Sequence, residues 1–284
     1  MKFSSYNMFL KDLYKDGLEY AASHAAKLGF SGVELLDFCP LRSKPTYSLY
    51  SIDEYKAAFE KYSLELACYS SAALLYTDDE QAVLEEIYRQ AEFASALGSK
   101  YFHHTFTIGL SSKPDTLAFS AVLERVAPMA EKVASKCREL GMTAIYEPQG
   151  AYFNGKNGFM ALFNEMKGRG AEIGVCGDVG NTMFFDEGAE KLFAECAADI
   201  KHVHVKDYIV SDVPLPEYPG NMKSISGMHL YDCEVGMGAI DLRSCFELLC
   251  KVGYDGYFSI ELLEDDEGAE RMMKYMESLL HSNK

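Results

Sequence analysis

The sequence alternates eight times between a short run rich in β-branched and aromatic residues and a longer segment with apolar residues at helical spacing. The β-rich runs cover residues 2–8, 32–37, 65–71, 100–105, 143–148, 173–178, 200–206 and 256–262. The helical segments cover residues 12–28, 53–62, 79–97, 115–140, 157–168, 187–198, 239–252 and 266–281. Such an alternation is typical of a parallel sheet whose strands are connected by helices.

The same local signal introduces several of the predicted strands. LGFSGVEL, ALGSKYFH, LGMTAIYE and VGYDGYFSIE each end a helix at glycine and continue into an apolar run. Eight units without an obvious edge strand favour an α/β fold closed into a (β/α)8 TIM barrel over an open doubly wound sheet, and no GxGxxG follows an early strand. We therefore predict a single TIM-barrel domain over residues 1–284.

One long stretch, 208–238, follows the seventh strand and is rich in proline and glycine. Long loops in compact domains are usually functional or mobile. We predict an irregular lid or rim loop over the mouth of the active site.

The charge balance bounds the classes of partner. The chain carries 27 Lys and Arg against 43 Asp and Glu, a net charge of −16, so we expect neither nucleic acid nor a membrane surface as a partner. The N-terminus has no apolar signal region, and no apolar run reaches the ~18 residues of a membrane span, which predicts a cytoplasmic protein. The eight cysteines form no CxxC pair, so we expect reduced thiols.

Four late strands finish in side chains that can bind a metal, namely Glu147, Asp178, His204 and Glu261. Catalytic residues of a barrel gather at the carboxyl ends of its strands, and side chains along a strand alternate between the interior and the helices. In the seventh strand the apolar neighbours of His204 suit the helix layer, so His204 is expected to face the mouth. Three carboxylates and one imidazole suit Mn²⁺, Mg²⁺ or Co²⁺ and tolerate Zn²⁺.

With GFSGVEL, YEP, GDVGN, HVHVKD and GYDGYFSIE in order along the chain, the sequence resembles the sugar phosphate isomerase/epimerase superfamily. These xylose-isomerase-like TIM barrels include ketose 3-epimerases, hydroxypyruvate isomerases and inosose dehydratases. The resemblance implies that Glu147, Asp178, His204 and Glu261 hold one divalent metal, with Mn²⁺ as the first choice. It also implies that Glu147 and Glu261 form the acid/base pair on opposite faces of the substrate.

This chemistry explains the residue types. Removal of a proton next to a carbonyl leaves an enediolate, whose charge a divalent metal can stabilise. One carboxylate removes the proton and another returns it. We therefore expect an isomerase or epimerase that acts on a small sugar or sugar derivative.

The chain departs from many epimerases at three positions. Asn181 stands where many have histidine, Val210 where many have arginine, and Phe153 where some ketose 3-epimerases have glutamate. GDVGN and HVHVKD look more like branches that act on sugar phosphates or sugar acids, where Lys206 could meet an anion. The alternative is that Lys206 pairs with Asp207 or with a carboxylate of the mouth. Asn181 and Lys206 are candidate substrate-binding residues.

Further candidates lie on the early strands. The fourth strand ends in YFHHTF, so either His103 or His104 faces the mouth, as an acid/base group or as a packed core histidine. Glu34 is a candidate hydrogen-bonding group of the pocket, and Tyr6 is a candidate aromatic wall for a sugar.

Three other functions compete with isomerisation. The same metal site could catalyse an elimination. The protein would then be a keto-inositol dehydratase or the metal-bearing subunit of a 3-keto C-glycoside lyase. The lyase would have a small β-rich partner subunit, whereas the isomerase is expected to be a homo-oligomer. An endonuclease would need a trinuclear zinc site and a basic groove, which the charge of −16 opposes. A sugar-binding barrel without turnover would be favoured if one ligand were missing, and none is.

Overall fold

The structure, a computed structural model, describes residues 1–37, 44–72, 75–106, 117–218, 222–261 and 265–281. Eight parallel strands close into a barrel in the order β1-β11-β7-β6-β5-β4-β3-β2. Their bounds are β1 (Lys2–Ser5), β2 (Gly32–Asp37), β3 (Glu65–Ser71), β4 (Tyr101–His104), β5 (Thr143–Tyr146), β6 (Ile173–Asp178), β7 (Ile200–Val205) and β11 (Tyr257–Ile260). The predicted TIM barrel is confirmed.

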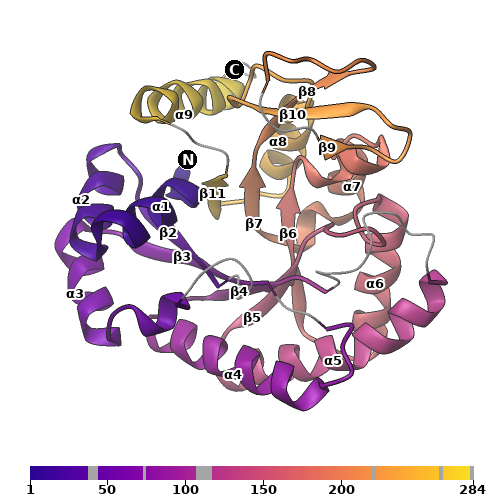
Figure 1. The fold of residues 1–284 in the computed structure, drawn as a ribbon, viewed down its shortest axis with the longest axis horizontal. Coiled ribbons are helices and arrows are strands. Elements are labelled where there is room, and N and C mark those ends of the chain that lie inside the picture. The colour runs from indigo at the N-terminus through magenta and orange to yellow at the C-terminus, as the bar shows by residue number, and fades with distance from the viewer. Residues whose placement is uncertain (38–43, 73–74, 107–116, 219–221, 262–264, 282–284) are drawn as a thin grey trace.

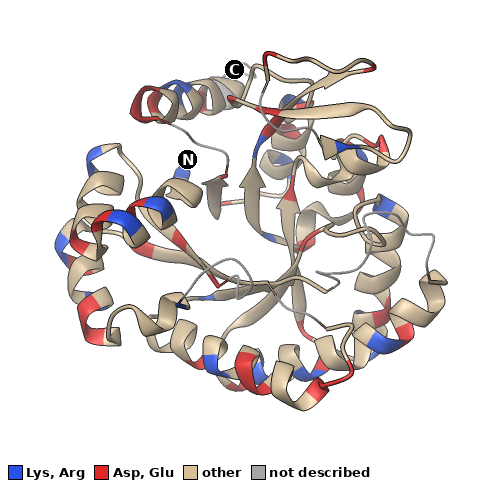
Figure 2. Ribbon diagram, viewed as in Figure 1, with Lys and Arg blue, Asp and Glu red and all other residues tan. Residues whose placement is uncertain are grey.

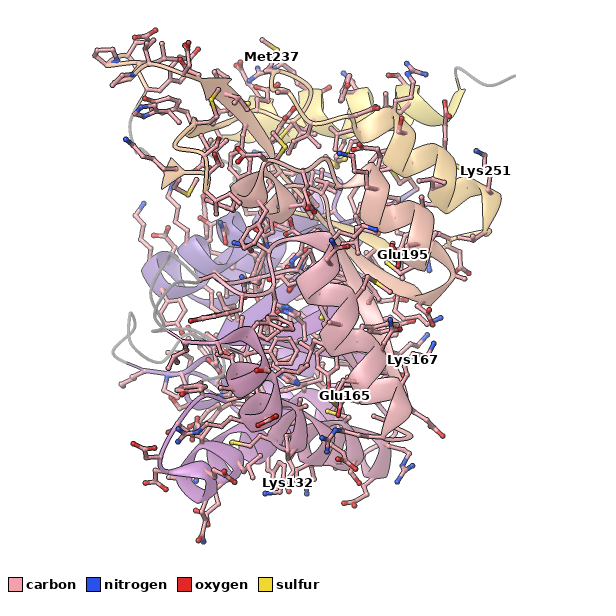
Figure 3. All side chains as sticks on the ribbon, turned by 90° about the vertical axis from the view of Figure 1, so that its right-hand side faces the viewer. Lys132, Glu165, Lys167, Glu195, Met237 and Lys251 are labelled. Carbon is pink, nitrogen blue, oxygen red and sulfur yellow. The ribbon has the colours of Figure 1, made fainter. Side chains whose placement is uncertain are left out.

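The helices form an outer layer around these strands (Figure 1). They are α1 (Asn7–Asp16), α2 (Leu18–Lys27), α3 (Ile52–Tyr62), α4 (Glu80–Ala96), α5 (Phe119–Glu139), α6 (Lys156–Gly168), α7 (Glu190–Cys196), α8 (Leu242–Lys251) and α9 (Asp266–His281), with short 3-10 turns η1 (Thr46–Ser48), η2 (Asn181–Phe185) and η3 (Ala197–Asp199). Charged residues gather on this layer (Figure 2), and labelled side chains such as Lys132, Glu165 and Lys251 point away from the barrel (Figure 3). The apolar core therefore lies between helices and strands.

The start of the chain differs from the prediction of one strand over 2–8 and one helix over 12–28. The strand β1 ends at Ser5, and the following segment divides into two helices at Gly17. Gly17 has φ +90°, a conformation that costs glycine little because it has no β-carbon. The N–H of Leu18 then donates to the Tyr50 hydroxyl at 3.2 Å, which ties the break to the neighbouring segment.

The prediction that 208–238 is irregular is wrong. An antiparallel sheet in the order β8-β10-β9 lies there, formed by β8 (Asp207–Ser211), β9 (Met222–Lys223) and β10 (His229–Cys233). The Asp207 carboxylate joins the start of β8 to the chain that follows β10, because it accepts backbone N–H bonds from Gly236, Gly238 and Ile240 at 2.9–3.1 Å. That this segment covers the mouth stays a prediction.

Two further sequence predictions concern covalent and membrane features. The described cysteines are all free thiols, as expected: Cys68, Cys137, Cys176, Cys196, Cys233, Cys245 and Cys250. Cys39 lies outside the described residues. Within the described ranges, no helix combines the length and hydropathy that crossing a membrane requires.

His24 links α2 to the start of α9 and gives the fold a pH dependence. Its ring nitrogens lie 2.7 Å from Asp12 Oδ2 and 3.0 Å from Asp266 Oδ1. Partial burial lowers the pKa of His24, but the hydrogen bonds to the two carboxylates outweigh it and raise the pKa above 6.5. The charged form is therefore favoured by folding, and this stability is present below pH ~6.5 and lost as the pH rises through the folded pKa.

As the pH rises through the folded pKa of His24, we expect its contribution to the free energy of unfolding to fall by less than about 1 kcal/mol, because the ion pairs are partly exposed. Urea unfolding of the wild type and of His24→Asn at pH 6 and pH 8.5 measures it. The difference between the two proteins should shrink at the higher pH. A difference that is constant or grows with pH would contradict the assignment.

Candidate metal and catalytic site

The four predicted ligands converge at the carboxyl ends of neighbouring strands. Glu147 follows β5, Asp178 ends β6, His204 lies in β7 and Glu261 follows β11. His204 Nδ1 lies 2.9 Å from Glu147 Oε2, 3.2 Å from Glu261 Oε1 and 3.9 Å from Asp178 Oδ2. The imidazole nitrogen therefore points at all three carboxylates.

The arrangement fits a divalent cation. Atoms bound to one ion at about 2.1 Å lie roughly 3 Å apart when adjacent in an octahedral shell, and farther apart when opposite. The ligand atoms of the four residues all lie within 4.8 Å of one another. Three carboxylates gather here against one lysine, Lys206, so the negative charge is in excess. Oxygen donors with one imidazole suit Mg²⁺ or Mn²⁺ and also permit Zn²⁺.

Asp178 is held rigidly at the start of its loop. Its Oδ1 accepts the backbone N–H groups of Gly180 at 2.8 Å and Asn181 at 2.7 Å, which leaves Oδ2 to face His204 and Lys206. Burial and the nearby Glu147 and Glu261 carboxylates raise the pKa of Asp178 to about 7, although the Lys206 ammonium opposes the shift. A cation bound beside Asp178 would therefore stabilise the ionised form of this carboxylate.

Lys206 crosses the same site from the end of β7. Its ammonium lies 2.9 Å from Asp178 Oδ2, forms an ion pair with Glu261 Oε2 and donates to Asn181 Oδ1 at 3.2 Å. Burial lowers the pKa of Lys206, but Asp178 and Glu261 outweigh burial and hold it well above its usual value. A β-carbon at Gly180 would lie 2.5 Å from Lys206 Cγ, so glycine makes room for this side chain.

Of the two expectations for Lys206, the structure agrees with the second: the lysine pairs with carboxylates of the mouth. Asp207 is not the partner, because its oxygens bind backbone N–H groups instead. Asn181 lies beside the lysine and is 5% exposed. A contact of either side chain with substrate stays a prediction.

Of the two neighbouring histidines, only His103 points into the barrel. Its Nδ1 lies 2.9 Å from Ser70 Oγ, and its Nε2 lies 3.4 Å from Glu147 Oε1. His104 points the other way, where its ring packs on Tyr146 and Phe106 with centroids 4.8 and 5.2 Å away. The candidate catalytic role of His104 is therefore withdrawn, because alternation along β4 turns the ring toward the helices.

Burial lowers the pKa of His104 to about 3, so the ring is a neutral part of the core. We expect His104→Ala to lower the free energy of unfolding by about 2–4 kcal/mol, as other large-to-small core substitutions do. The kcat per folded molecule should stay unchanged, since His104 does not reach Glu147. Denaturant unfolding together with rates corrected for the folded fraction checks both statements. A normal midpoint with a lowered kcat would instead place His104 in the reaction.

Tyr6 and Glu34 both contact His204: Tyr6 packs on the face of its ring, and Glu34 lies at the ring edge beside Nε2. The Tyr6 ring stacks on the imidazole, with centroids 5.4 Å apart and planes 23° apart, so it remains a candidate wall. Glu34 is fully buried and lies 3.0 Å from His204 Nε2. The other ring nitrogen, Nδ1, faces the three carboxylates of the proposed metal site. A direct contact of Glu34 with substrate is not supported by this position.

Sequence reasoning missed the side chains that surround Glu34. Ser70, Ser259 and His202 form hydrogen bonds with its carboxylate. The alternation within β3, β7 and β11 places each of them inside the barrel. The register between strands, which brings them to Glu34, is not readable from one sequence.

Comparison with known proteins agrees with this architecture. The family model of the xylose isomerase-like TIM barrel matches residues 22–279. No curated protein is similar enough to count as a match. Among solved structures, a xylose isomerase-like TIM barrel protein from Mycobacterium smegmatis in complex with magnesium has 14% sequence identity and a TM-score of 0.73, over 99% of this chain and 97% of that one.

Two enzymes of different type have the same fold. An L-ribulose 3-epimerase has 14% identity and a TM-score of 0.75, over 99% of this chain and 95% of its own. A probable 3-DHS dehydratase from Bacillus anthracis has 14% identity and a TM-score of 0.73, over 98% of this chain and 99% of its own. Structural likeness at such identities shows the fold, while the family model spans most of the sequence. The chain belongs to the xylose isomerase-like TIM barrel family.

Proposed function

We propose that this chain is a divalent-metal-dependent isomerase or epimerase of a small sugar or sugar derivative, working through an enediolate. The observation that carries the proposal is the placement of two glutamates around one imidazole nitrogen. Glu147 and Glu261 each turn one oxygen to His204 Nδ1, at 2.9 and 3.2 Å. They follow β5 and β11, so they approach this point from different parts of the barrel rim.

The second oxygen of each glutamate has a different partner. Glu147 Oε1 lies 3.4 Å from His103 Nε2, whereas Glu261 Oε2 pairs with the Lys206 ammonium. Burial raises the pKa of Glu147, but His103 and His204 outweigh burial and hold it well below the usual range. Glu147 is thus an ionised carboxylate that can take a proton from carbon.

A bound divalent cation would stabilise negative charge on the substrate oxygens. Glu147 would remove the proton next to the carbonyl, and Glu261 would pass a proton from the Lys206 ammonium to the opposite face or to the neighbouring carbon. Lys206 keeps Glu261 in place through its second oxygen. The Tyr6 ring covers one face of the His204 imidazole.

Elimination is the second candidate, favoured by the contact between His103 and Glu147. A histidine next to the base could give a proton to a leaving group. This would make the chain a dehydratase or a lyase on the same site.

The experiment that separates these functions is incubation with ketoses, sugar phosphates, inososes and 3-keto glycosides in D₂O with Mn²⁺, followed by NMR of the products after removal of the metal. The proposal expects deuterium next to the carbonyl and an epimer or isomer from at least one compound. Loss of water or release of an aglycone without an epimer would overturn it in favour of elimination. Binding without any exchange would indicate a sugar-binding barrel.

A further inference from the structure

The Glu34 carboxylate lies below the four proposed ligands and contacts four polar side chains. Glu34 Oε1 lies 2.5 Å from Ser70 Oγ and 3.0 Å from His204 Nε2. Its other oxygen, Oε2, lies 2.8 Å from His202 Nε2 and 2.7 Å from Ser259 Oγ. Glu34 is 0% exposed, so its carboxylate depends on these neighbours for hydrogen bonds. Four donors around two oxygens compensate for the burial of its charge.

The chemistry of these groups fixes where the hydrogens lie. An ionised carboxylate has no hydrogen to give and accepts from each neighbour. The imidazole of His204 therefore carries a hydrogen on Nε2, and its Nδ1 faces Glu147, Asp178 and Glu261. This is the orientation that a metal-binding histidine needs.

His103 is connected to Glu34 through the hydroxyl of Ser70. Ser70 has one hydroxyl hydrogen, which it gives to Glu34, so its oxygen accepts from His103 Nδ1 at 2.9 Å. His103 therefore carries a hydrogen on Nδ1, while its Nε2 lies 3.4 Å from Glu147 Oε1. Glu34 thus fixes a hydrogen on Nε2 of His204 and, through Ser70, a hydrogen on Nδ1 of His103.

We propose that Glu34 is a positioning residue that fixes a hydrogen on Nε2 of His204, so that Nδ1 is presented to the cation, and that through Ser70 it fixes a hydrogen on Nδ1 of His103. The role toward the cation rests on the proposed function. The placement of the hydrogens does not, because it follows from the contacts of Glu34.

Nitrogen-15 NMR of the histidine rings tests the placement directly in the wild-type protein. Signals are assigned by their loss in His204→Ala and His103→Ala. With and without Zn²⁺, we expect a hydrogen on Nε2 of His204, and on adding Zn²⁺ we expect the Nδ1 signal to shift. For His103 we expect a hydrogen on Nδ1. A His204 ring with hydrogen on Nδ1 alone, or with Zn²⁺ on Nε2, would overturn the proposal.

Substitution of Glu34 tests its effect on the cation. Glutamine has the same shape but offers one accepting oxygen and one donating NH₂, so it cannot accept from all four neighbours. We expect Glu34→Gln to weaken Mn²⁺ binding by about 10–100-fold, the usual cost of losing such a partner. Competition with a chelator measures the Kd. The matched control is Glu92→Gln, because Glu92 lies on the surface and pairs with Lys136.

The remaining outcomes are also decisive. A Kd for folded Glu34→Gln within twofold of wild type would contradict the positioning role. If Glu34→Gln does not fold, Ser70→Ala takes its place. We then expect a mixture of His103 tautomers while the hydrogen of His204 stays on Nε2, and an unchanged His103 ring would contradict the step through Ser70. If the wild type binds no divalent cation, the proposed function fails, while the NMR still decides where the hydrogens lie.

Discussion

Glutamine in place of Glu147 is expected to lower kcat for proton exchange by at least ~10²-fold, the scale of a positioned acid or base. The amide keeps the shape of the side chain but cannot take a proton from carbon. Glu261→Gln should cause a loss of the same order, because the proton must also be returned. Both rates are measured on the substrate found in the D₂O experiment, at saturating Mn²⁺.

Two controls separate chemistry from metal loss and from unfolding. Metal content is measured for each variant, since both glutamates also turn an oxygen to His204 Nδ1. Glu195→Gln is the matched control, because Glu195 lies on the surface in an ion pair with Lys156 at 2.8 Å. Near-normal rates in metal-loaded, folded Glu147→Gln would refute the mechanism of two carboxylates.

Asparagine in place of Asp178 is expected to weaken the binding of a divalent cation by at least ~10²-fold, more than the loss of an outer partner causes. Asp178 Oδ1 accepts two backbone N–H bonds, so the oxygen of asparagine must stay there. The NH₂ group then replaces Oδ2, where it faces Lys206 and His204 and cannot bind a cation. His204→Ala removes the imidazole and should weaken binding as well.

Isothermal titration with Mn²⁺ and circular dichroism of the same samples measure affinity and folding together. The contacts with the backbone of the following loop are preserved in Asp178→Asn, so its fold should persist. A folded Asp178→Asn that binds Mn²⁺ as tightly as the wild type would show that the cation lies elsewhere.

The sequence was sufficient to predict the barrel and the four convergent residues, because both follow from local periodicity. Strand alternation places His204 on the inner face of β7, and the ends of parallel strands meet at one rim. The break at Gly17 was missed because the apolar periodicity continues across it. The small sheet within 208–238 was missed because its strands are short and lie among prolines and glycines.

What the sequence could not predict depends on contacts between distant strands. Alternation alone left open whether His103 or His104 faces inward, and the contact of His103 with Glu147 decides it. The pairing of Lys206 with Asp178 and Glu261 joins the ends of three strands. Glu34 meets His204 across 170 positions of sequence, a contact that the closure of the barrel creates.

The central claim is that one divalent cation binds at Glu147, Asp178, His204 and Glu261. Metal analysis after equilibration with Mn²⁺, Mg²⁺, Co²⁺ or Zn²⁺ tests it most directly, with the wild type and Asp178→Asn measured side by side. The account predicts about one ion per chain in the wild type, with Mn²⁺ as the preferred metal, and a large loss in the variant. A wild-type protein that takes up none of the four ions would contradict it.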